Sequence, residues 1–260
     1  VVFVGGISPQ LEGEEMPIEI SGFKGGDRTN IELPKVQRNF LKALKEAGKK
    51  VVFVNCSGSA IALTPETESC DAILQAWYPG QEGGEAVARV LFGEYNPAGK
   101  LPVTFYKNSE QLPDFKDYSM KGRTYRYMND ALFPFGYGLS YTSFRIGDAT
   151  LSNSILKKGE KITLKVPVSN VGKKDGTEVV QVYVKDPADT DGPLKTLKAF
   201  ERVEVKAGKT AEAVITLDSS NFELFDAATN TVRAKAGKYE VYYGSSSADK
   251  DLKKLDILFQ

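Results

Sequence analysis

The sequence contains no histidine. This absence excludes Ser-His-Asp and Cys-His nucleophile pairs, histidine metal ligands and a histidine general base. Proton transfer near neutral pH must therefore use a carboxyl group or a tyrosine. Cysteine is also scarce: Cys56 and Cys70 lack the spacing of a CxxC or metal-binding motif, so we expect two core thiols rather than a disulfide bridge. We expect no metal ion and no cofactor.

Long apolar runs and an excess of charge of one sign are absent too. No stretch approaches the ~20 apolar residues of a membrane-spanning helix. Lys plus Arg number 34 and Asp plus Glu also number 34, so no charged field attracts nucleic acid or an anionic membrane, and we expect neither as a partner. Residue 1 lies inside an apolar segment with no leader before it, so we expect a piece of a longer protein.

The first half of the sequence alternates strand-like and helix-like segments. Residues 1–4 and 51–54 are short and continuously apolar, which is typical of buried parallel strands. Between them, Pro34 opens a segment with an apolar stripe that Gly48 ends, as expected of a helix. We expect a further strand over 71–77 and a helix through 86–91. The first half is therefore predicted to be the end of an open, mostly parallel α/β sheet, with its working loops beyond the strand carboxyl ends.

The second half has the period-two alternation of short strands separated by turns rich in glycine and proline. About seven short strands within ~115 residues are typical of an immunoglobulin-like β-sandwich. We place an α/β domain at 1–143 and a β-sandwich domain at 144–260. The α/β domain includes an aromatic linker that we expect to pack the joint between the domains, composed of Tyr125, Tyr127, Phe133, Phe135, Tyr137 and Tyr141. The sandwich strands are expected over 161–168, 177–185, 202–205, 212–217 and 238–243.

Three carboxylates, Glu12, Glu14 and Glu15, lie within four residues of one another, shortly after the first expected strand. Like charges at this spacing disfavour one another, which raises the pKa of at least one of them. A carboxyl group with a raised pKa can donate a proton near neutral pH, as the cleavage of an acetal requires. By composition alone, a solvated acidic loop is the better explanation of this pattern.

A series of motifs in fixed order favours the proton donor over the solvated loop. Together these motifs resemble the C-terminal region of family-three glycoside hydrolases, which include β-glucosidases and β-xylosidases. The second half resembles the fibronectin type III-like domain of the same family, and the resemblance covers nearly the whole chain. The motifs are Val4-Gly5-Gly6, Glu12-Gly13-Glu14, Asp27-Arg28, Trp77-Tyr78-Pro79-Gly80, Asn96-Pro97-Ala98-Gly99-Lys100, Tyr125-Arg126-Tyr127, Phe135-Gly136-Tyr137-Gly138, Ser169-Asn170-Val171-Gly172 and Leu197-Lys198-Ala199-Phe200.

The resemblance implies a retaining exo-acting β-glycosidase that hydrolyses terminal O-glycosidic bonds. In such enzymes an aspartate on a preceding (β/α)8 barrel is the nucleophile, and a glutamate of the α/β domain acts as acid and then as base. On this resemblance we assign the acid/base role to Glu14, with Glu12 as the alternate. Asp27 and Arg28 are expected to hold the loop as an ion pair, and Trp77 to pack rather than to stack on sugar.

The barrel and its nucleophile are absent from this sequence, so the chain alone is expected to be inactive. The expected partners are an oligo- or aryl-glycoside substrate and the barrel of the same enzyme. The substrate-binding residues and the sugar, whether glucose, xylose or arabinose, stay open. Periplasmic or secreted localisation follows from the resemblance alone.

Two other functions fit parts of the sequence. A carbohydrate-binding or structural accessory module without catalysis would bind sugar in the absence of the barrel. A nucleotide-binding α/β domain would need a phosphate-binding motif, but Gly80, Gly83 and Gly84 lack both the GxGxxG spacing and the lysine of a P-loop. The acidic loop and the ordered motifs favour the glycosidase.

Overall fold

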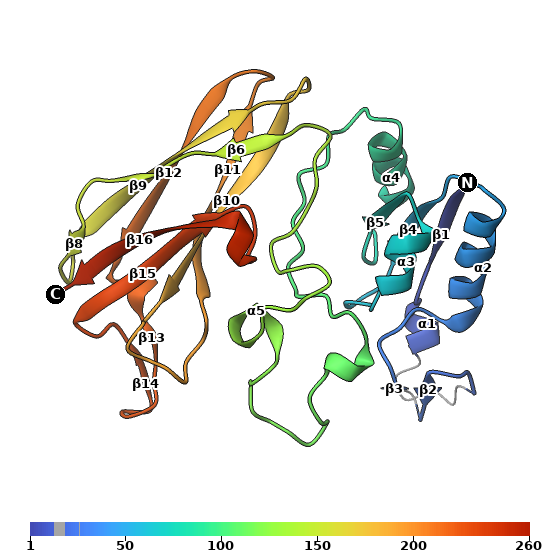
Figure 1. Ribbon diagram of the computed structural model, residues 1–260, viewed down its shortest axis with the longest axis horizontal. Coiled ribbons are helices and arrows are strands. Elements are labelled where there is room, and N and C mark those ends of the chain that lie inside the picture. Colours follow the sequence, from blue (N-terminus) through green and yellow to red (C-terminus); the bar gives the residue numbers. More distant parts are fainter. Residues whose placement is uncertain (13–18, 26) are drawn as a thin grey trace. The chain divides into compact units, whose positions relative to one another are not determined.

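The computed structural model describes residues 1–12, 19–25 and 27–260, with only the backbone of Glu12 (Figure 1). The chain forms two compact units. The α/β unit comprises Val1–Glu94, Thr104–Gly122 and Asp130–Phe133. The sandwich unit comprises Tyr95–Val103, Arg123–Asn129 and Pro134–Gln260, so the segment between residues 95 and 133 alternates between the two units.

The α/β unit is built on a three-stranded parallel sheet in the order β1-β4-β5. The strand Val51–Val54 expected from its apolar run corresponds to the central strand, in which Phe53 and Val54 are almost fully buried. Helix α2 runs from Lys35 to Glu46 after Pro34, as the sequence predicts, and lies alongside β1 in Figure 1. The elements of this unit are β1 (Val2–Gly6), α1 (Pro9–Glu12), β2 (Phe23–Lys24), β3 (Asp27–Arg28), α2 (Lys35–Glu46), β4 (Val52–Cys56), α3 (Thr64–Ser69), β5 (Ala72–Gln75), α4 (Gly83–Leu91) and η1 (Ser109–Gln111).

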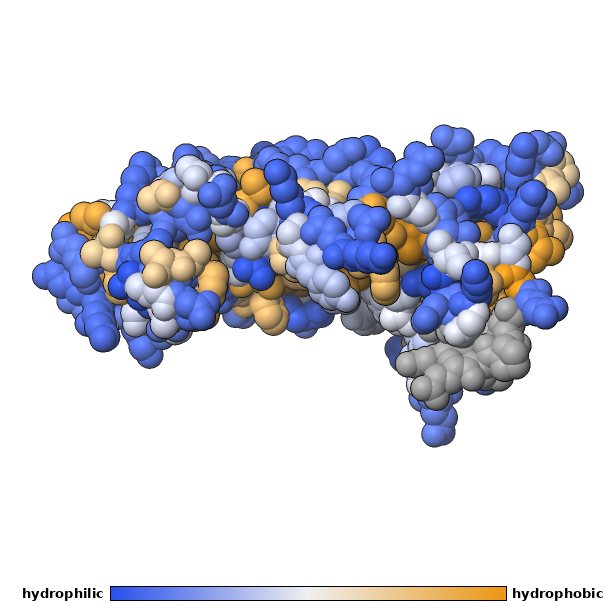
Figure 2. Space-filling view, turned by 90° about the horizontal axis from the view of Figure 1, so that it is seen from below, coloured by the Kyte–Doolittle hydropathy of each residue, from blue (hydrophilic) through white to orange (hydrophobic). Residues whose placement is uncertain are grey.

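An apolar surface along β1 and α2 remains open in this chain. Only Leu41 of the predicted α2 stripe is buried, whereas Val36 is 76% exposed and Phe40 49% exposed. On the edge strand β1, Val2 and Val4 are also more than half exposed. Figure 2 shows hydrophobic surface at the end of the view where β1 and α2 lie. Strands of parallel sheets are normally covered on both faces, so this surface is unusual for a finished sheet.

The sandwich consists of two sheets, ordered β11-β10-β15-β16-β8 and β12-β9-β6, and β7 pairs with β9. In the same unit, β13 and β14 form a separate two-stranded sheet. Apolar residues from both sheets alternate inward and form one core, as the period-two pattern predicts. The predicted combination of an α/β sheet with a β-sandwich is confirmed. The elements of this unit are α5 (Thr124–Tyr127), β6 (Phe144–Ile146), β7 (Thr150–Leu151), β8 (Ile155–Leu156), β9 (Lys161–Asn170), β10 (Gly176–Lys185), β11 (Thr196–Val205), β12 (Thr210–Asp218), η2 (Ser219–Phe222), β13 (Leu224–Asp226), β14 (Thr231–Arg233), β15 (Gly237–Gly244), η3 (Asp249–Asp251) and β16 (Leu252–Phe259).

Segments from the expected linker cover the outer face of β10. Tyr125 and Phe135 stack on each other, and each also packs edge-on against Tyr183, which is fully buried. The Gln181 amide donates hydrogen bonds to the carbonyls of Gly136 and Ser245, and a Cβ at Gly136 would lie 1.9 Å from its Oε1. These polar and aromatic side chains of β10 are buried because the linker segments replace solvent on that face.

The two cysteines are free thiols, as predicted. Burial, together with the nearby carboxylates of Glu66 and Asp71, raises the pKa of Cys70 to about 11. Cys56 lies at the end of β4, and burial raises its pKa as well. Both thiols therefore stay protonated, and so unreactive, at physiological pH.

Asn170 ties the start of the sandwich to its first long strand, and its replacement by alanine is a test of this fold. Its Oδ1 accepts hydrogen bonds from Thr142 Oγ1 and Gly172 N, and its Nδ2 donates to the carbonyls of Lys174 and Val205. Because buried partners are left unsatisfied, Asn170→Ala is expected to lower the free energy of unfolding by about 2–3 kcal/mol. Chemical denaturation followed by circular dichroism measures the change.

The neighbouring half-buried residue Ser169 provides the control for this prediction. Ser169 forms its hydrogen bond with Thr210 at the surface, so Ser169→Ala should change the free energy of unfolding by no more than about 0.5 kcal/mol. Equal effects of the two substitutions would contradict the proposed role of Asn170.

Candidate active site

The carboxyl ends of β1, β4 and β5 meet at one side of the α/β unit because the three strands are parallel. We call this region the carboxyl edge and define it as residues 6–7, 55–59 and 75–78. In open α/β sheets, ligands bind beyond such an edge. In the sequence, the acidic segment follows β1 and α1 and precedes the hairpin of β2 and β3.

The first stem of the acidic loop is clamped by a side chain of α2. Gln37 Nε2 donates a hydrogen bond of 2.7 Å to the Gly6 carbonyl, and the Gly6 N–H donates one of 2.8 Å to Gln37 Oε1. One residue further, the Ile7 N–H donates to the Cys56 carbonyl at 2.9 Å, and the Tyr78 hydroxyl donates to the Ile7 carbonyl at 2.9 Å. The backbone that leaves β1 is thus fixed by bonds from three different elements before α1 begins.

Glycine is required where this stem leaves the sheet. Gly6 has φ of 122°, and a Cβ there would lie 2.0 Å from the Cys56 carbonyl oxygen. Such a contact cannot be relieved by moving a flexible side chain, because the opposing atom belongs to the backbone of β4. The close approach of the two strands therefore depends on the absence of a side chain at residue 6.

Polar side chains at the ends of β4 and β5 form a connected chain. Asn55 Nδ2 donates to Gln75 Oε1 at 2.6 Å and to Ser57 Oγ at 3.3 Å. Ser57 Oγ in turn donates to the Ser59 carbonyl at 2.8 Å. Asn55 is fully buried, and its Oδ1 has no hydrogen-bond partner in the part of the chain that the structure describes. A buried amide oxygen without a hydrogen bond is rare in a core that serves only packing, so this end of the sheet is a candidate for a functional role.

The second stem of the acidic loop is the β2–β3 hairpin, in which Phe23 pairs with Arg28. Arg28 Nη2 donates a hydrogen bond of 2.8 Å to Ser59 Oγ and so joins the hairpin to the carboxyl edge. The expected ion pair with Asp27 is not found, although both residues are described. Neighbouring residues of a strand point to opposite faces, which explains why these two side chains do not meet.

The three glutamates of the acidic loop are not described at the level of their side chains. Glu14, the preferred acid/base residue, and Glu15 lie outside the described residues. The alternate, Glu12, is the last residue of α1, and only its backbone is described. Both stems of the loop are therefore placed at the carboxyl edge, and the assignment among the glutamates stays a prediction.

Two aromatic residues at the end of β5 pack within the unit. Trp77 has a positive φ of 56° and meets the buried ring of Phe105 edge-on, with 6.1 Å between ring centroids. The Tyr78 ring lies against Gly58, where a Cβ would be 2.6 Å from Cε2. A tryptophan in this backbone region is strained by about 1–3 kcal/mol, so the surrounding structure must hold it there.

The described carboxyl groups are poor candidates for a proton donor. Burial disfavours the ionised form of Glu32, but hydrogen bonds from the Ser109 hydroxyl and N–H outweigh it and hold its pKa below the ordinary value. Glu66 is buried and forms a salt bridge with Arg38 at 2.7 Å. Among the described residues, every carboxyl group whose pKa clearly departs from its usual value has it lowered. An acid active near neutral pH is not found among them.

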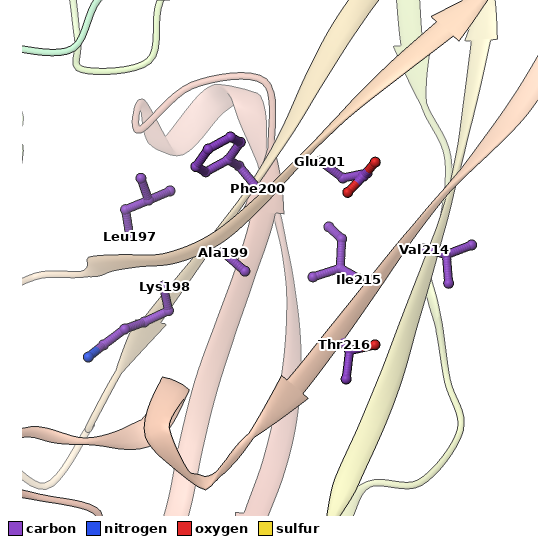
Figure 3. A pocket seen from close by; sticks show the side chains of 8 residues that line it. All are labelled: Leu197, Lys198, Ala199, Phe200, Glu201, Val214, Ile215 and Thr216. Atoms are coloured by element: carbon purple, nitrogen blue, oxygen red, sulfur yellow. The ribbon is translucent and has the colours of Figure 1, made fainter.

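A cavity lies elsewhere, between β11 and β12 of the sandwich (Figure 3). It has a volume of ≈ 450 Å³ and is an open groove beside Phe200 and Val214. Glu201 is the one carboxylate that lines it. Retaining glycoside cleavage needs two carboxyl groups about 5–5.5 Å apart, so this groove does not have the groups for that reaction.

No described group of cysteine and acidic side chains is arranged to bind a metal ion. Within the same residues, no helix is long and apolar enough to cross a membrane.

Comparison with known proteins identifies the family. Residues 1–141 match the glycosyl hydrolase family 3 C-terminal domain, and residues 178–247 match a fibronectin type III-like domain. The chain belongs to glycoside hydrolase family 3. It corresponds to the C-terminal portion of such an enzyme, and the predicted family is confirmed.

Its relatives are named as glycosidases. The xylan 1,4-beta-xylosidase of Xylanibacter ruminicola is 66% identical over 99% of this chain and 30% of that protein. The periplasmic beta-glucosidase of Salmonella typhimurium is 39% identical over 86% of this chain and 31% of that protein. A beta-glucosidase from Listeria innocua solved in complex with glucose has a TM-score of 0.80 at 29% identity, over 99% of this chain and 36% of that chain. The family 3 chain thus spans about a third of the length of the relatives it matches.

The glycine at the first stem is a direct test of the carboxyl edge. Gly6→Ala is expected to lower the free energy of unfolding of the α/β unit by roughly 3 kcal/mol, because the new Cβ overlaps the Cys56 carbonyl and the positive φ is strained. Gly48→Ala is the control, since Gly48 also has a positive φ, of 69°, but has no atom near its missing Cβ. Its cost should be about 1 kcal/mol.

Thermal and denaturant unfolding followed by the fluorescence of Trp77, the single tryptophan, reports on this unit. If Gly6→Ala lowers the free energy of unfolding no more than Gly48→Ala does, β1 and β4 do not approach each other at Gly6 as closely as described.

Proposed function

We propose that this chain supplies the acid/base carboxylate of a retaining exo-acting β-glycosidase, with Glu14 in that role and Glu12 as the alternate. The observation that carries the proposal is the fixing of both stems of the acidic loop at the carboxyl edge. The Gln37 clamp holds the stem before the glutamates, and the Arg28–Ser59 hydrogen bond holds the hairpin after them. The two described stems thus lie at the edge where such sheets bind ligands.

The chemistry proceeds in two proton transfers. In the first step, the acid gives its proton to the glycosidic oxygen while the bond from that oxygen to the anomeric carbon breaks and a carboxylate nucleophile takes the anomeric carbon. In the second step, the same group, now ionised, takes a proton from water, which attacks the anomeric carbon and releases the sugar with retained configuration.

The nucleophile is proposed to lie outside this chain, on the preceding part of the same protein. Two observations support this partner. The relatives are about three times longer than the segment they share with this chain. In addition, the open apolar surface of β1 and α2, with Val4 and Val36 exposed, has the character of a buried interface. A preceding domain that covers this surface would bring its own carboxylate toward the carboxyl edge.

Xylose is the proposed sugar at the cleaved end of the substrate. The high identity to a protein named as a xylan 1,4-beta-xylosidase favours it over glucose, since the matched proteins named as beta-glucosidases are more distant. A β-xyloside with an oligosaccharide or aryl leaving group is accordingly the first substrate to test.

Residues 1–260 alone are expected to hydrolyse neither an aryl β-xyloside nor an aryl β-glucoside. The reason is that an acid without a nucleophile cannot form the glycosyl-enzyme intermediate. Release of nitrophenol from para-nitrophenyl glycosides by the purified fragment, compared with the full-length protein, measures this. Measurable turnover of either aryl glycoside by the fragment would contradict the proposal that the nucleophile lies outside the chain.

In the full-length protein, Glu14→Ala is expected to lower kcat/KM on xylobiose by about 10²–10⁴-fold, the usual contribution of general acid catalysis. The loss should be far smaller on an aryl xyloside with a good leaving group, which needs little protonation. The ratio of the two losses identifies the acid.

Glu19→Ala is the matched control, because Glu19 is an exposed carboxylate of the same connection between α1 and β2. It should leave both rates within about twofold of the unmodified enzyme, the scale of an exposed-site change. If Glu14→Ala behaves like Glu19→Ala while Glu12→Ala shows the dependence on leaving group, the alternate assignment replaces the preferred one.

A further inference from the structure

The cavity in the sandwich unit lies where the edges of its two sheets part. Strand β11 is an edge of the larger sheet, and β12 is an edge of the smaller one. The space between them has a volume of ≈ 450 Å³, which is within the range of small-ligand sites. We call this space the β11–β12 groove. Its lining includes Lys198, Phe200, Glu201, Val214, Ile215 and Thr216.

A β-bulge in β11 shapes one wall of the groove. The pairing of β11 with β10 shifts by one residue between Leu197 and Ala199, which leaves Lys198 without a partner in the ladder. Such a bulge bends its strand and redirects a side chain. Lys198 Nζ donates a hydrogen bond to the Glu223 carbonyl. An ammonium group has three N–H donors, and the described residues occupy only this one, so two remain for a ligand.

Glu201 places a carboxylate where the sandwich otherwise has apolar side chains. It pairs with Val180, which is fully buried, and paired residues of neighbouring strands share a face. Further along β11 on that face, Val203 and Val205 belong to the core. Glu201 is nevertheless exposed, and Figure 3 shows its side chain with that of Ile215 between the two strands. It has no ion pair or hydrogen bond within the described residues.

The other walls combine apolar surface with one more polar group. Ile215 is 4% exposed and provides an apolar floor. Phe200 and Val214 are large exposed side chains at the two rims. The Thr216 hydroxyl is exposed and has no hydrogen bond to any residue that the structure describes. The groove therefore offers a hydrogen-bond donor, an acceptor and a hydroxyl beside apolar surface.

This combination limits the kind of ligand that fits. Lys198 and Glu201 carry opposite charges, so the groove favours neither an anion nor a cation. An apolar ligand would desolvate both charged groups without replacing their hydrogen bonds with water, which is unfavourable. A neutral sugar ring meets both requirements, because its C–H face contacts apolar side chains while its hydroxyl groups donate and accept hydrogen bonds.

We propose that the β11–β12 groove is a carbohydrate-binding site for xylose units of a polymeric substrate, separate from the unit whose bond is cleaved. The C–H face of the sugar contacts Phe200, and its hydroxyl groups donate to Glu201 and accept from Lys198. The choice of xylose rests on the function proposed above. The sandwich unit then holds the polysaccharide on the enzyme and takes no part in bond cleavage.

The test is the electrophoresis of the full-length protein in native gels that contain increasing amounts of soluble xylan. The mobility of the unmodified protein should fall as xylan increases, and this dependence gives a Kd. Glu201→Ala should raise the Kd by about 10-fold, because a hydrogen bond to a charged group is lost. Phe200→Ala should raise it by about 3- to 10-fold, because an aromatic contact is lost.

Two matched controls lie outside the groove. Glu204 is an exposed carboxylate of the same strand, and Phe225 is an exposed aromatic residue of β13. Glu204→Ala and Phe225→Ala should each leave the Kd within about twofold of the unmodified protein. All four variants should also hydrolyse an aryl β-xyloside with kcat/KM within about twofold, because this small substrate does not need the groove.

Three results would overturn the proposal. The first is a mobility that does not respond to xylan, or responds only to a β-glucan. The second is a Kd that is the same in the groove variants as in their controls. The third is a Glu201→Ala protein that forms dimers in size-exclusion chromatography yet keeps its xylan affinity, because an inward-pointing charge on an edge strand also prevents strand pairing between copies.

The catalytic variant separates this inference from the proposed function. Glu14→Ala should lose activity on xylobiose but keep its xylan-dependent mobility. If Glu14→Ala and Glu12→Ala keep full activity while Phe200→Ala and Glu201→Ala lose xylan affinity, the proposed acid/base role fails and the carbohydrate site stands. If Glu14→Ala shows the leaving-group dependence while no groove variant changes the Kd, the carbohydrate site fails and the proposed function stands.

Discussion

The close approach of the backbone of β1 to that of β4 at Gly6 is the constraint on which the proposed site depends. Only glycine fits against the Cys56 carbonyl at this point, and Gln37 then pairs with both backbone groups of that glycine. These contacts fix the direction in which the chain leaves the sheet. The acidic segment of the sequence follows this stem, so the point at which the chain leaves the sheet before it is set by a local packing requirement.

A few polar side chains at the carboxyl edge form a hydrogen-bonded network next to the apolar core of the sheet. Asn55, Ser57 and Gln75 are hydrogen-bonded to one another at the strand ends, although Asn55 and Gln75 belong to strands that are otherwise mostly apolar. A buried polar network is stabilising only when its members are satisfied, yet this one leaves Asn55 Oδ1 and Arg28 Nη1 without partners. Unsatisfied groups of this kind are expected where a site is completed by further groups.

The sandwich unit shows a different use of buried polar groups. Lys100 pairs with Glu178 at 2.7 Å, and Gln181 bonds to Gly136, so segments that precede the sandwich in sequence are built into its outer face. The aromatic rings of Tyr125 and Phe135 complete that cover on Tyr183. The aromatic segment is therefore a structural part of the sandwich unit and is held there by specific contacts.

Elements with a strong periodic signal could be predicted from the sequence. The apolar run of residues 51–54 predicted the position of β4, and Pro34 and Gly48 predicted the two ends of α2. The alternation of apolar and polar residues predicted β9 and β12. Helix α3 was missed because its six residues are polar and carry no apolar stripe. Strand β11 begins six residues before the predicted 202–205, because it is an edge strand and most of its side chains are only partly buried.

The family motifs indicated the acidic loop. The hydrogen bonds that fix the two stems of this loop could not be predicted from the sequence. Gln37 and Gly6 are 31 residues apart, as are Arg28 and Ser59, and only the fold brings each pair together. The expected Asp27–Arg28 ion pair was wrong for a simple geometric reason, since adjacent strand residues face opposite ways. Sequence proximity is thus a poor guide to partners within a strand.

Azide rescue of the full-length Glu14→Ala variant tests the central claim most directly. Azide is a small nucleophile that needs no general base, so it can attack the glycosyl-enzyme intermediate when the acid/base carboxylate is missing. The account predicts that azide restores turnover of an aryl β-xyloside and yields a β-xylosyl azide with retained configuration. No rescue of Glu14→Ala, together with formation of that azide by Glu12→Ala, would contradict the assignment of Glu14. No azide product from either variant would contradict an acid/base role for both Glu14 and Glu12.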